Sequence, residues 1–375
     1  MRTTSRTHAL DSSNALFSPP VSKATHVPPP MGTWRLAMNV VGREMVVLVD
    51  RRALATNALL LGLLGLALLA SLCLGSISIR PLEALQALVG RGDAMAVFVI
   101  QELRLPRSLA GIFTGAAFAL SGCLMQTLAR NRLATPGIIG IDNGATAFAV
   151  ASVVGIGVIV APPAMALAGA ATATAITFGL AGGAGTRGYR FIVAGIGVGA
   201  VFGALTQLML SRVSIDVANA AYPWTVGSLN ARPGGAVLVL AIGLALGLIA
   251  AQMLARSLAV LRFSDSVAQG LGIRVRAGRY LALALSVTLT ALAVAVAGPI
   301  GLVALIGPEI ARHLSSKRGV PLFGSALAGA LIMVLADLAG RLILAPIEVP
   351  VGIVTAVIGS PLLLWILLRQ PRGQP

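Results

Sequence analysis

Long apolar runs separated by short polar segments repeat along most of the chain. A helix that crosses a bilayer needs about 20 mainly apolar residues, because lipid offers no hydrogen-bond partner to an unpaired backbone group. The pattern therefore predicts an all-α, polytopic membrane protein with both ends of the helical region on one side. We place the ten predicted membrane-spanning helices at residues 54–75, 107–128, 137–160, 163–182, 191–211, 235–255, 280–298, 300–314, 321–341 and 349–368.

The first 50 residues follow a different pattern. Five prolines fall within residues 19–30, among serines and threonines, and no long apolar run occurs there. Such a composition buries too little apolar surface to fold, so we predict a largely disordered cytoplasmic tail. Residues 34–50 are weakly amphipathic and carry arginines, which predicts a helix on the cytoplasmic surface. We therefore expect a tail at residues 1–50 and a transmembrane domain at residues 51–372.

Composition and charge support a membrane protein. Of the residues, 57% are hydrophobic and 11% charged, a balance that a soluble domain of this size could not bury. The net charge is +16, but the basic residues lie between the apolar runs and only 4% of residues are aromatic, so nucleic-acid binding is not expected. With a cytoplasmic N-terminus, 21 of the 28 lysines and arginines fall inside. This bias predicts that both termini lie in the cytoplasm.

The chain lacks the residue patterns of several catalytic classes. Its two lysines, Lys23 and Lys317, do not belong to a phosphate-binding loop of the form G-x-x-x-x-G-K-[ST]. Its two cysteines, Cys73 and Cys123, lie inside apolar runs and are expected to be small core residues rather than a disulfide or metal pair. No hydrolase motif accompanies the three histidines. We expect no enzyme activity, no cofactor and no resident metal.

Ionisable groups inside the predicted helices are few. Of the twelve acidic residues, only Asp142, Glu309 and Asp337 fall in or beside a predicted span, each near its end. Carriers driven by an ion gradient need such groups at mid-membrane. An ion-coupled secondary transporter therefore stays open as an alternative, but the chain has few ionisable groups that could serve it. The spacings Glu309–Arg312 and Asp337–Arg341 each predict a local ion pair on one helix.

Several motifs occur together in a recognisable order. The segment Leu103-Arg104-Leu105-Pro106-Arg107 opens the second predicted span, and residues 130–145 read RNRLATPGIIGIDNGA. Residues 298–303 read GPIGLV, and residues 348–361 read EVPVGIVTAVIGSP. Over about residues 54–370 the chain resembles the permease family of ABC importers for ferric siderophores, haem and cobalamin.

This resemblance implies a type II ABC importer fold and a transport function without covalent chemistry. It favours ferric siderophore complexes as substrate, with cobalamin or haem as alternatives. It also implies three partners: a cytoplasmic ABC ATPase dimer, a periplasmic or lipid-anchored substrate-binding protein, and a second permease subunit, identical or related.

The resemblance also assigns candidate site residues. Arginines at the positions of Arg104, Arg107 and Arg341 receive acidic residues of the binding protein, while lipid anchoring is the alternative. Residues 264–273 match the segment that contacts the ATPase. In this segment Ser264 or Ser266 is expected to begin a short helix and Gly270 or Gly272 to end it, although an ordinary solvated loop is the alternative. The residues assigned to ATPase coupling are Ser264, Asp265, Gln269, Gly270, Leu271, Gly272 and Ile273.

The turn at residues 131–137 is the candidate inner gate, with Asn131 and Leu133 as gate residues and a simple connecting turn as the alternative. Here the chain departs from the family, which commonly has Asn-Pro-Leu-Ala where residues 131–134 read NRLA. A second departure is Pro308-Glu309, where the family commonly has Pro-His. Gly195, Gly199 and Gly203 recur at intervals of four, which predicts a helix face that permits close packing.

Overall fold

A computed structural model describes residues 33–40, 43–75, 77–155, 160–181, 189–315 and 319–368. The chain divides into two units, Met1–Arg51 and Arg52–Pro375. In the first unit, strands β1 (Thr33–Val40) and β2 (Arg43–Asp50) pair antiparallel, with Thr33 opposite Asp50. The prediction of a surface helix over residues 34–50 is therefore wrong. β-Branched valines are frequent in this segment and favour extended backbone, which outweighs weak helical amphipathicity. The predicted disorder before residue 33 concerns residues outside the described ones.

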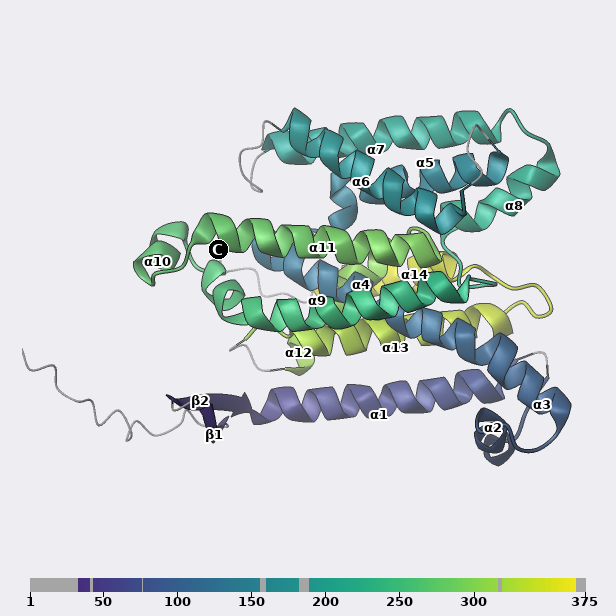
Figure 1. The fold of residues 1–375 in the computed structure, drawn as a ribbon, viewed down its shortest axis with the longest axis horizontal. Coiled ribbons are helices and arrows are strands. Elements are labelled where there is room, and N and C mark those ends of the chain that lie inside the picture. The colour runs from purple at the N-terminus through teal and green to yellow at the C-terminus, as the bar shows by residue number, and fades with distance from the viewer. Residues whose placement is uncertain are drawn as a thin grey trace, which may run out of the picture. The chain divides into compact units, whose positions relative to one another are not determined.

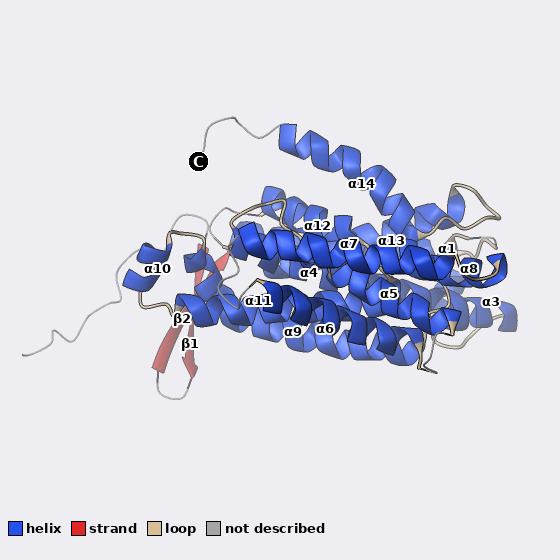
Figure 2. Cartoon of the chain, turned by 90° about the horizontal axis from the view of Figure 1, so that it is seen from above, coloured by secondary structure: helices blue, strands red, loops and turns tan. Residues whose placement is uncertain are grey.

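The second unit consists of helices, several of which are short. Its elements are α1 (Arg51–Cys73), α2 (Pro81–Leu88), α3 (Ala94–Phe98), the π-helix η1 (Val99–Arg104), α4 (Leu105–Ala129), the 3₁₀ helix η2 (Pro136–Ile139), α5 (Ile141–Val154), α6 (Pro162–Leu180), α7 (Tyr189–Leu210), α8 (Ile215–Val226), α9 (Gly234–Leu261), α10 (Asp265–Gly270), α11 (Val275–Ala297), α12 (Gly301–Leu314), α13 (Leu322–Leu342) and α14 (Val351–Leu368). Helices α3 and α8 lie at one end of this unit and α10 lies at the other (Figure 1 and Figure 2).

Each of the ten predicted spans coincides with one helix, namely α1, α4, α5, α6, α7, α9, α11, α12, α13 and α14. Seven helices of the described chain are long and apolar enough to cross a membrane. The predicted span at residues 137–160 is too long, because α5 covers only Ile141–Val154. Gly140 and Gly155 flank α5 with φ of 80° and 79°, a left-handed conformation that ends a helix.

Helix α4 is the centre of the helical unit, and nearly all of its length is buried. Small residues let its neighbours approach closely. A Cβ added to Gly115 would lie 2.3 Å from the carbonyl oxygen of Gly329 on α13, and one added to Gly122 would lie 1.9 Å from that of Ala304 on α12. Backbones this close gain van der Waals contact and leave no room for side chains. The packing fixes α12 and α13 against α4. Helix α4 carries Arg107 and α13 carries Arg341, two of the candidate docking residues.

The glycine face predicted on α7 is confirmed in part. A Cβ at Gly195 would lie 2.2 Å from the carbonyl oxygen of Ile138 in η2, and one at Gly199 would lie 3.0 Å from Nδ2 of Asn143 on α5. Nothing lies within 4 Å of the corresponding position at Gly203. The close approach is therefore confined to the half of α7 that contacts η2 and the start of α5.

Candidate functional site

The predicted docking arginines lie at the α8 end of the helical unit, where α4 begins and α13 ends. Arg104 is only 7% exposed. Its Nη1 donates a hydrogen bond to the carbonyl oxygen of Leu72 at 2.6 Å, and its Nη2 donates to that of Ile77. Gly75 leaves room for this guanidinium, since a Cβ there would lie 2.8 Å from Nη2. Arg104 thus joins the start of α4 to the segment that follows α1.

Arg107 and Arg341 belong to a four-residue ionic network with Asp337 and Glu348. Arg107 donates from Nε to Oδ1 of Asp337 at 3.0 Å and from Nη1 to Oε2 of Glu348 at 2.7 Å. Arg341 Nε lies 3.2 Å from Oδ2 of Asp337, which confirms the ion pair predicted from their spacing. Arg341 Nη2 also donates to Oγ of Ser71 at 2.6 Å. The network therefore connects α1, α4, α13 and the segment before α14.

These arginines are more deeply buried than the acid that Arg107 holds at the surface. The side chains of Arg107 and Arg341 are 14% and 8% exposed, whereas that of Glu348 is 44% exposed. The sequence places three arginines at the family's positions, but it does not identify their partners, which lie up to 270 residues away. Docking by Arg104, Arg107 and Arg341 stays a prediction. Their internal role, holding helix ends together, is what the structure describes.

The residues at the α10 end form a compact turn between α9 and α11, which we call the coupling knob (residues 264–273). Ser264 Oγ accepts a hydrogen bond from the backbone N–H of Val267 at 3.4 Å and caps α10 at its start. Gly272 has φ of 76°, and the N–H of Ile273 returns to the carbonyl oxygen of Ala268 at 3.1 Å. The predicted short capped helix is confirmed, with Ser264 rather than Ser266 at its start.

The knob is anchored on one side and apolar on the other. Asp265 Oδ1 pairs with Arg130 Nη2 at 2.8 Å and with Arg279 Nη2. Phe263, Val267 and Leu271 are 59%, 47% and 62% exposed and recur at intervals of four. An exposed apolar row at the polar end of a membrane protein is typical of a surface that binds a protein partner.

The candidate gate turn begins where α4 ends. Arg130 has φ of 50° and terminates α4. Asn131 Oδ1 then accepts a hydrogen bond from the N–H of Leu133 at 2.9 Å, and Leu133 is 44% exposed. The Asn131 side chain thus shapes the turn locally. The role of Asn131 and Leu133 as a gate stays a prediction.

Arg132, in the same turn, connects it to α12. Arg132 Nη1 lies 3.1 Å from Oε1 of Glu309, whose side chain is only 4% exposed. Glu309 also accepts a hydrogen bond from Arg312 Nη2 at 2.7 Å, which confirms the predicted pair on α12. Sequence spacing predicts the second contact, but not the first.

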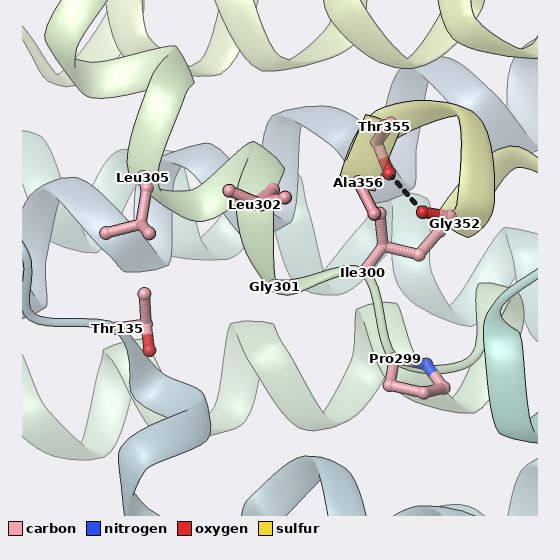
Figure 3. A pocket seen from close by; sticks show the side chains of 9 residues that line it. All are labelled: Thr135, Pro299, Ile300, Gly301, Leu302, Leu305, Gly352, Thr355 and Ala356. Atoms are coloured by element: carbon pink, nitrogen blue, oxygen red, sulfur yellow. Dashed lines mark hydrogen bonds between the residues drawn. The ribbon is translucent and has the colours of Figure 1, made fainter. Parts of the chain in front are cut away.

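A cavity of about 370 Å³ lies between the gate turn, the start of α12 and the start of α14. Thr135 and Leu305 lie on one side of it and Gly352 and Thr355 on the other (Figure 3). Thr355 Oγ1 donates to the carbonyl oxygen of Gly352 at 2.9 Å. The cavity is lined by Thr135, Pro299, Ile300, Gly301, Leu302, Leu305, Gly352, Thr355 and Ala356. Its lining is mainly apolar, as in sites that hold organic ligands.

The loop between α8 and α9 packs behind this cavity. The N–H of Ser228 donates to the carbonyl oxygen of Ala297 at 2.7 Å, next to the cavity residues that begin with Pro299. Arg232 holds the loop in shape, because its Nε donates to the carbonyl oxygen of Ser228 at 2.9 Å and its guanidinium lies 4.2 Å from the ring centre of Trp224. Burial lowers the pKa of Arg232 to about 10, so it stays charged at neutral pH.

Comparison with known proteins identifies the class of this arrangement. The model of the FecCD transport family matches residues 63–369. The chain belongs to the FecCD transport family. The ferric enterobactin permease FepG of Escherichia coli K12 is 34% identical over 328 residues, which cover 87% of this chain and 99% of that protein. The achromobactin permease CbrC of Dickeya dadantii is 36% identical and covers 81% of this chain and 88% of its own length.

The solved structures agree with the FecCD assignment. A metal-chelate type ABC transporter in an inward-facing conformation matches with a TM-score of 0.73 and 26% identity, over 85% of this chain and all of that chain. This FecCD chain is therefore a multi-pass transport permease of the ABC class and not an enzyme. The ten-helix arrangement follows the fold expected from its sequence.

Proposed function

We propose that this FecCD permease carries ferric siderophore complexes across the bacterial inner membrane, with ATP hydrolysed by a partner subunit. FecCD relatives that are named for ferric enterobactin, achromobactin and iron citrate support this substrate class. Cobalamin and haem are the alternative substrates within the resembled family. The excess of basic residues on the α10 side supports an orientation with this end, and both termini, in the cytoplasm.

The coupling knob is the observation that carries the ABC assignment. The knob is capped at its start, ends at a glycine and is held by the ion pairs of Asp265 with Arg130 and Arg279. These contacts make it rigid, so it can transmit a displacement of the ATPase to the helices. Its exposed row of Phe263, Val267 and Leu271 offers an apolar contact to a cytoplasmic ATPase. Because Arg130 lies at the end of α4, motion of the knob reaches the gate turn directly.

The α8 end is the proposed docking surface for the substrate-binding protein. Arg107 is held by Glu348, which is half exposed, so an acidic residue of the partner can compete for the same guanidinium. Arg104 and Arg341 are more deeply buried. They hold this surface in place through the carbonyl oxygen of Leu72 and the carboxylate of Asp337. A second permease subunit completes the pathway in this proposal, since the chain supplies one wall of a conduit.

The experiment is ligand-stimulated ATP hydrolysis by the complete complex in vesicles. We expect hydrolysis to rise when the binding protein carries a ferric siderophore, and to stay basal with haem or cobalamin. Leu271→Asp should abolish the stimulation, because it places a charge in the apolar contact with the ATPase. Leu246→Ala, at an exposed position midway along α9 and away from both proposed partner surfaces, should not. Stimulation that is unchanged by Leu271→Asp would contradict the assigned role of the knob.

A further inference from the structure

Asp142 differs from Glu309 and Asp337, the other two acids that lie in or beside a predicted membrane span. Glu309 is paired with Arg132 and Arg312. Asp337 is paired with Arg107 and Arg341. Among the described residues, no lysine or arginine pairs with Asp142, and its Oδ1 is buried without a hydrogen-bond partner.

The carboxylate of Asp142 lies close to two of the residues that line the cavity. Its Oδ2 is 4.0 Å from the position of a Cβ on Gly301, which lines the cavity (Figure 3). It is 2.5 Å from that of a Cβ on Gly137, and the same Gly137 position is 3.7 Å from Oγ1 of Thr135, another lining residue. Gly137 thus leaves the space that the carboxylate uses.

Two short helices begin at this place. Helices α5 and α12 have 14 residues each, or about 21 Å, which is less than the roughly 30 Å hydrocarbon core of a bilayer. Their N-termini carry partial positive charge, which favours the ionised form of a nearby carboxylate. One turn further along α5, the hydroxyl of Thr146 is also buried without a partner. Within the part of the chain that the structure describes, the carboxyl group of Asp142 therefore has no basic side chain as a partner.

A carboxylate that is buried inside a membrane protein without a partner is unfavourable unless a ligand pairs with it. A bare metal ion does not fit, because the described residues contain no group of three His, Cys, Asp or Glu side chains that could hold one. A polycarboxylate chelate does not fit either, because like charges repel. An ammonium group fits, since it pairs with a single carboxylate and can also donate to the Thr135 hydroxyl.

We propose that Asp142 binds a protonated amine on the transported ferric chelate, and so favours chelates with a cationic arm over fully anionic ones. The apolar side chains of Pro299, Ile300 and Leu302 contact the rest of the ligand. This inference rests on the proposed import of ferric siderophores and specifies their chemistry.

The charge at the cavity is tested first, without any partner protein. Thr135→Cys in the full chain is labelled with a cationic and an anionic methanethiosulfonate reagent, and the natural Cys73 and Cys123 are buried. We expect the ratio of cationic to anionic rates to fall about tenfold in Asp142→Asn, since a unit charge acts strongly at this range in a protein. Asp142→Glu should keep the ratio. Asp216→Asn, on the exposed first turn of α8, is the matched control and should not change it.

An unchanged ratio in Asp142→Asn, or an equal fall in Asp216→Asn, would overturn the inference while leaving the proposed transport function intact.

A second experiment tests ligand choice in vesicles that contain the complete complex. The probes are a linear tris-hydroxamate ferric chelate with one free amine and the same chelate after N-acetylation. We expect wild type to prefer the free amine severalfold and Asp142→Asn to lose that preference. If wild type and Asp142→Asn prefer the free-amine chelate to the same extent, the inference is also overturned. Failure of wild type to transport either chelate would instead count against the proposed function.

Discussion

Arg132 and Glu309 form an ion pair across 177 residues of sequence, with Nη1 3.1 Å from Oε1. Both residues stand at positions where the sequence departs from the pattern expected of the resembled family. The departures explain each other, because a glutamate that is buried on α12 needs cations and the gate turn supplies one. The pair also joins the candidate gate to a helix that lines the cavity.

The first prediction concerns this pair. Arg132→Ala should lower the free energy of unfolding by less than about 1 kcal/mol, because the Arg132 side chain is 54% exposed and Glu309 keeps Arg312. Glu309→Ala should cost more, since it removes the acid from a buried position beside Arg312. Thermal unfolding in detergent, with a double-mutant cycle, measures both terms. Equal losses in the two single variants would show that the pair is not organised as described.

The second prediction concerns the ionic network at the α8 end. Asp337→Ala should destabilise the protein by about 3–5 kcal/mol, because it leaves two buried arginines without their shared acid. Glu348→Ala is the matched control, as the loss of a half-exposed partner of Arg107 should cost less than about 1 kcal/mol. The same thermal unfolding assay separates them. A larger loss for Glu348→Ala would mean that Asp337 is not the centre of the network.

The third prediction tests the packing of α4. Gly122→Ala should prevent correct folding, because the added Cβ would lie 1.9 Å from the carbonyl oxygen of Ala304 and neither backbone can move without separating α4 from α12. Gly62→Ala on α1 meets nothing within 4 Å and should be neutral or stabilising by up to about 1 kcal/mol. Size-exclusion profiles of the two variants in detergent provide the measurement. Normal folding of Gly122→Ala would contradict the described contact between the two helices.

The fourth prediction concerns the anchor of the coupling knob. Asp265→Ala removes the acid that Arg130 and Arg279 share, so we expect hydrogen exchange of residues 264–273 to accelerate while the melting temperature changes little. Ligand-stimulated ATP hydrolysis should fall in the same variant, because a loose knob transmits less motion. Arg276→Ala, an exposed position on α11, should change neither quantity. Unchanged exchange in Asp265→Ala would exclude the ion pairs as the source of rigidity.

The parts of this structure that depend on local sequence could be predicted, and the parts that depend on packing could not. Apolar runs located all ten helices, and spacings of three and four residues gave the pairs Glu309–Arg312 and Asp337–Arg341. The partner of Arg132 and the second partner of Asp337 lie 177 and 230 residues away, where only tertiary contact brings them together.

Two further features show the same limit. Arg104 looks from sequence like a free cation at a membrane surface, yet backbone carbonyl oxygens of Leu72 and Ile77 occupy its donors. The cavity residues come from three separate segments, and nothing in their spacing marks them as neighbours. The weak amphipathicity of residues 34–50 predicts a helix, but the valines of this segment favour the extended backbone of the β-hairpin.

Chelate uptake into sealed vesicles tests the central claim most directly. Vesicles that contain the permease, its ATPase, ATP and a loaded binding protein should accumulate ferric chelate. Vesicles that contain this chain alone should accumulate none, with or without a proton or sodium gradient, because the chain has no phosphate-binding loop and two of its three intramembrane acids are held by arginines. Accumulation driven by an ion gradient with this chain alone would contradict the account and support a secondary transporter.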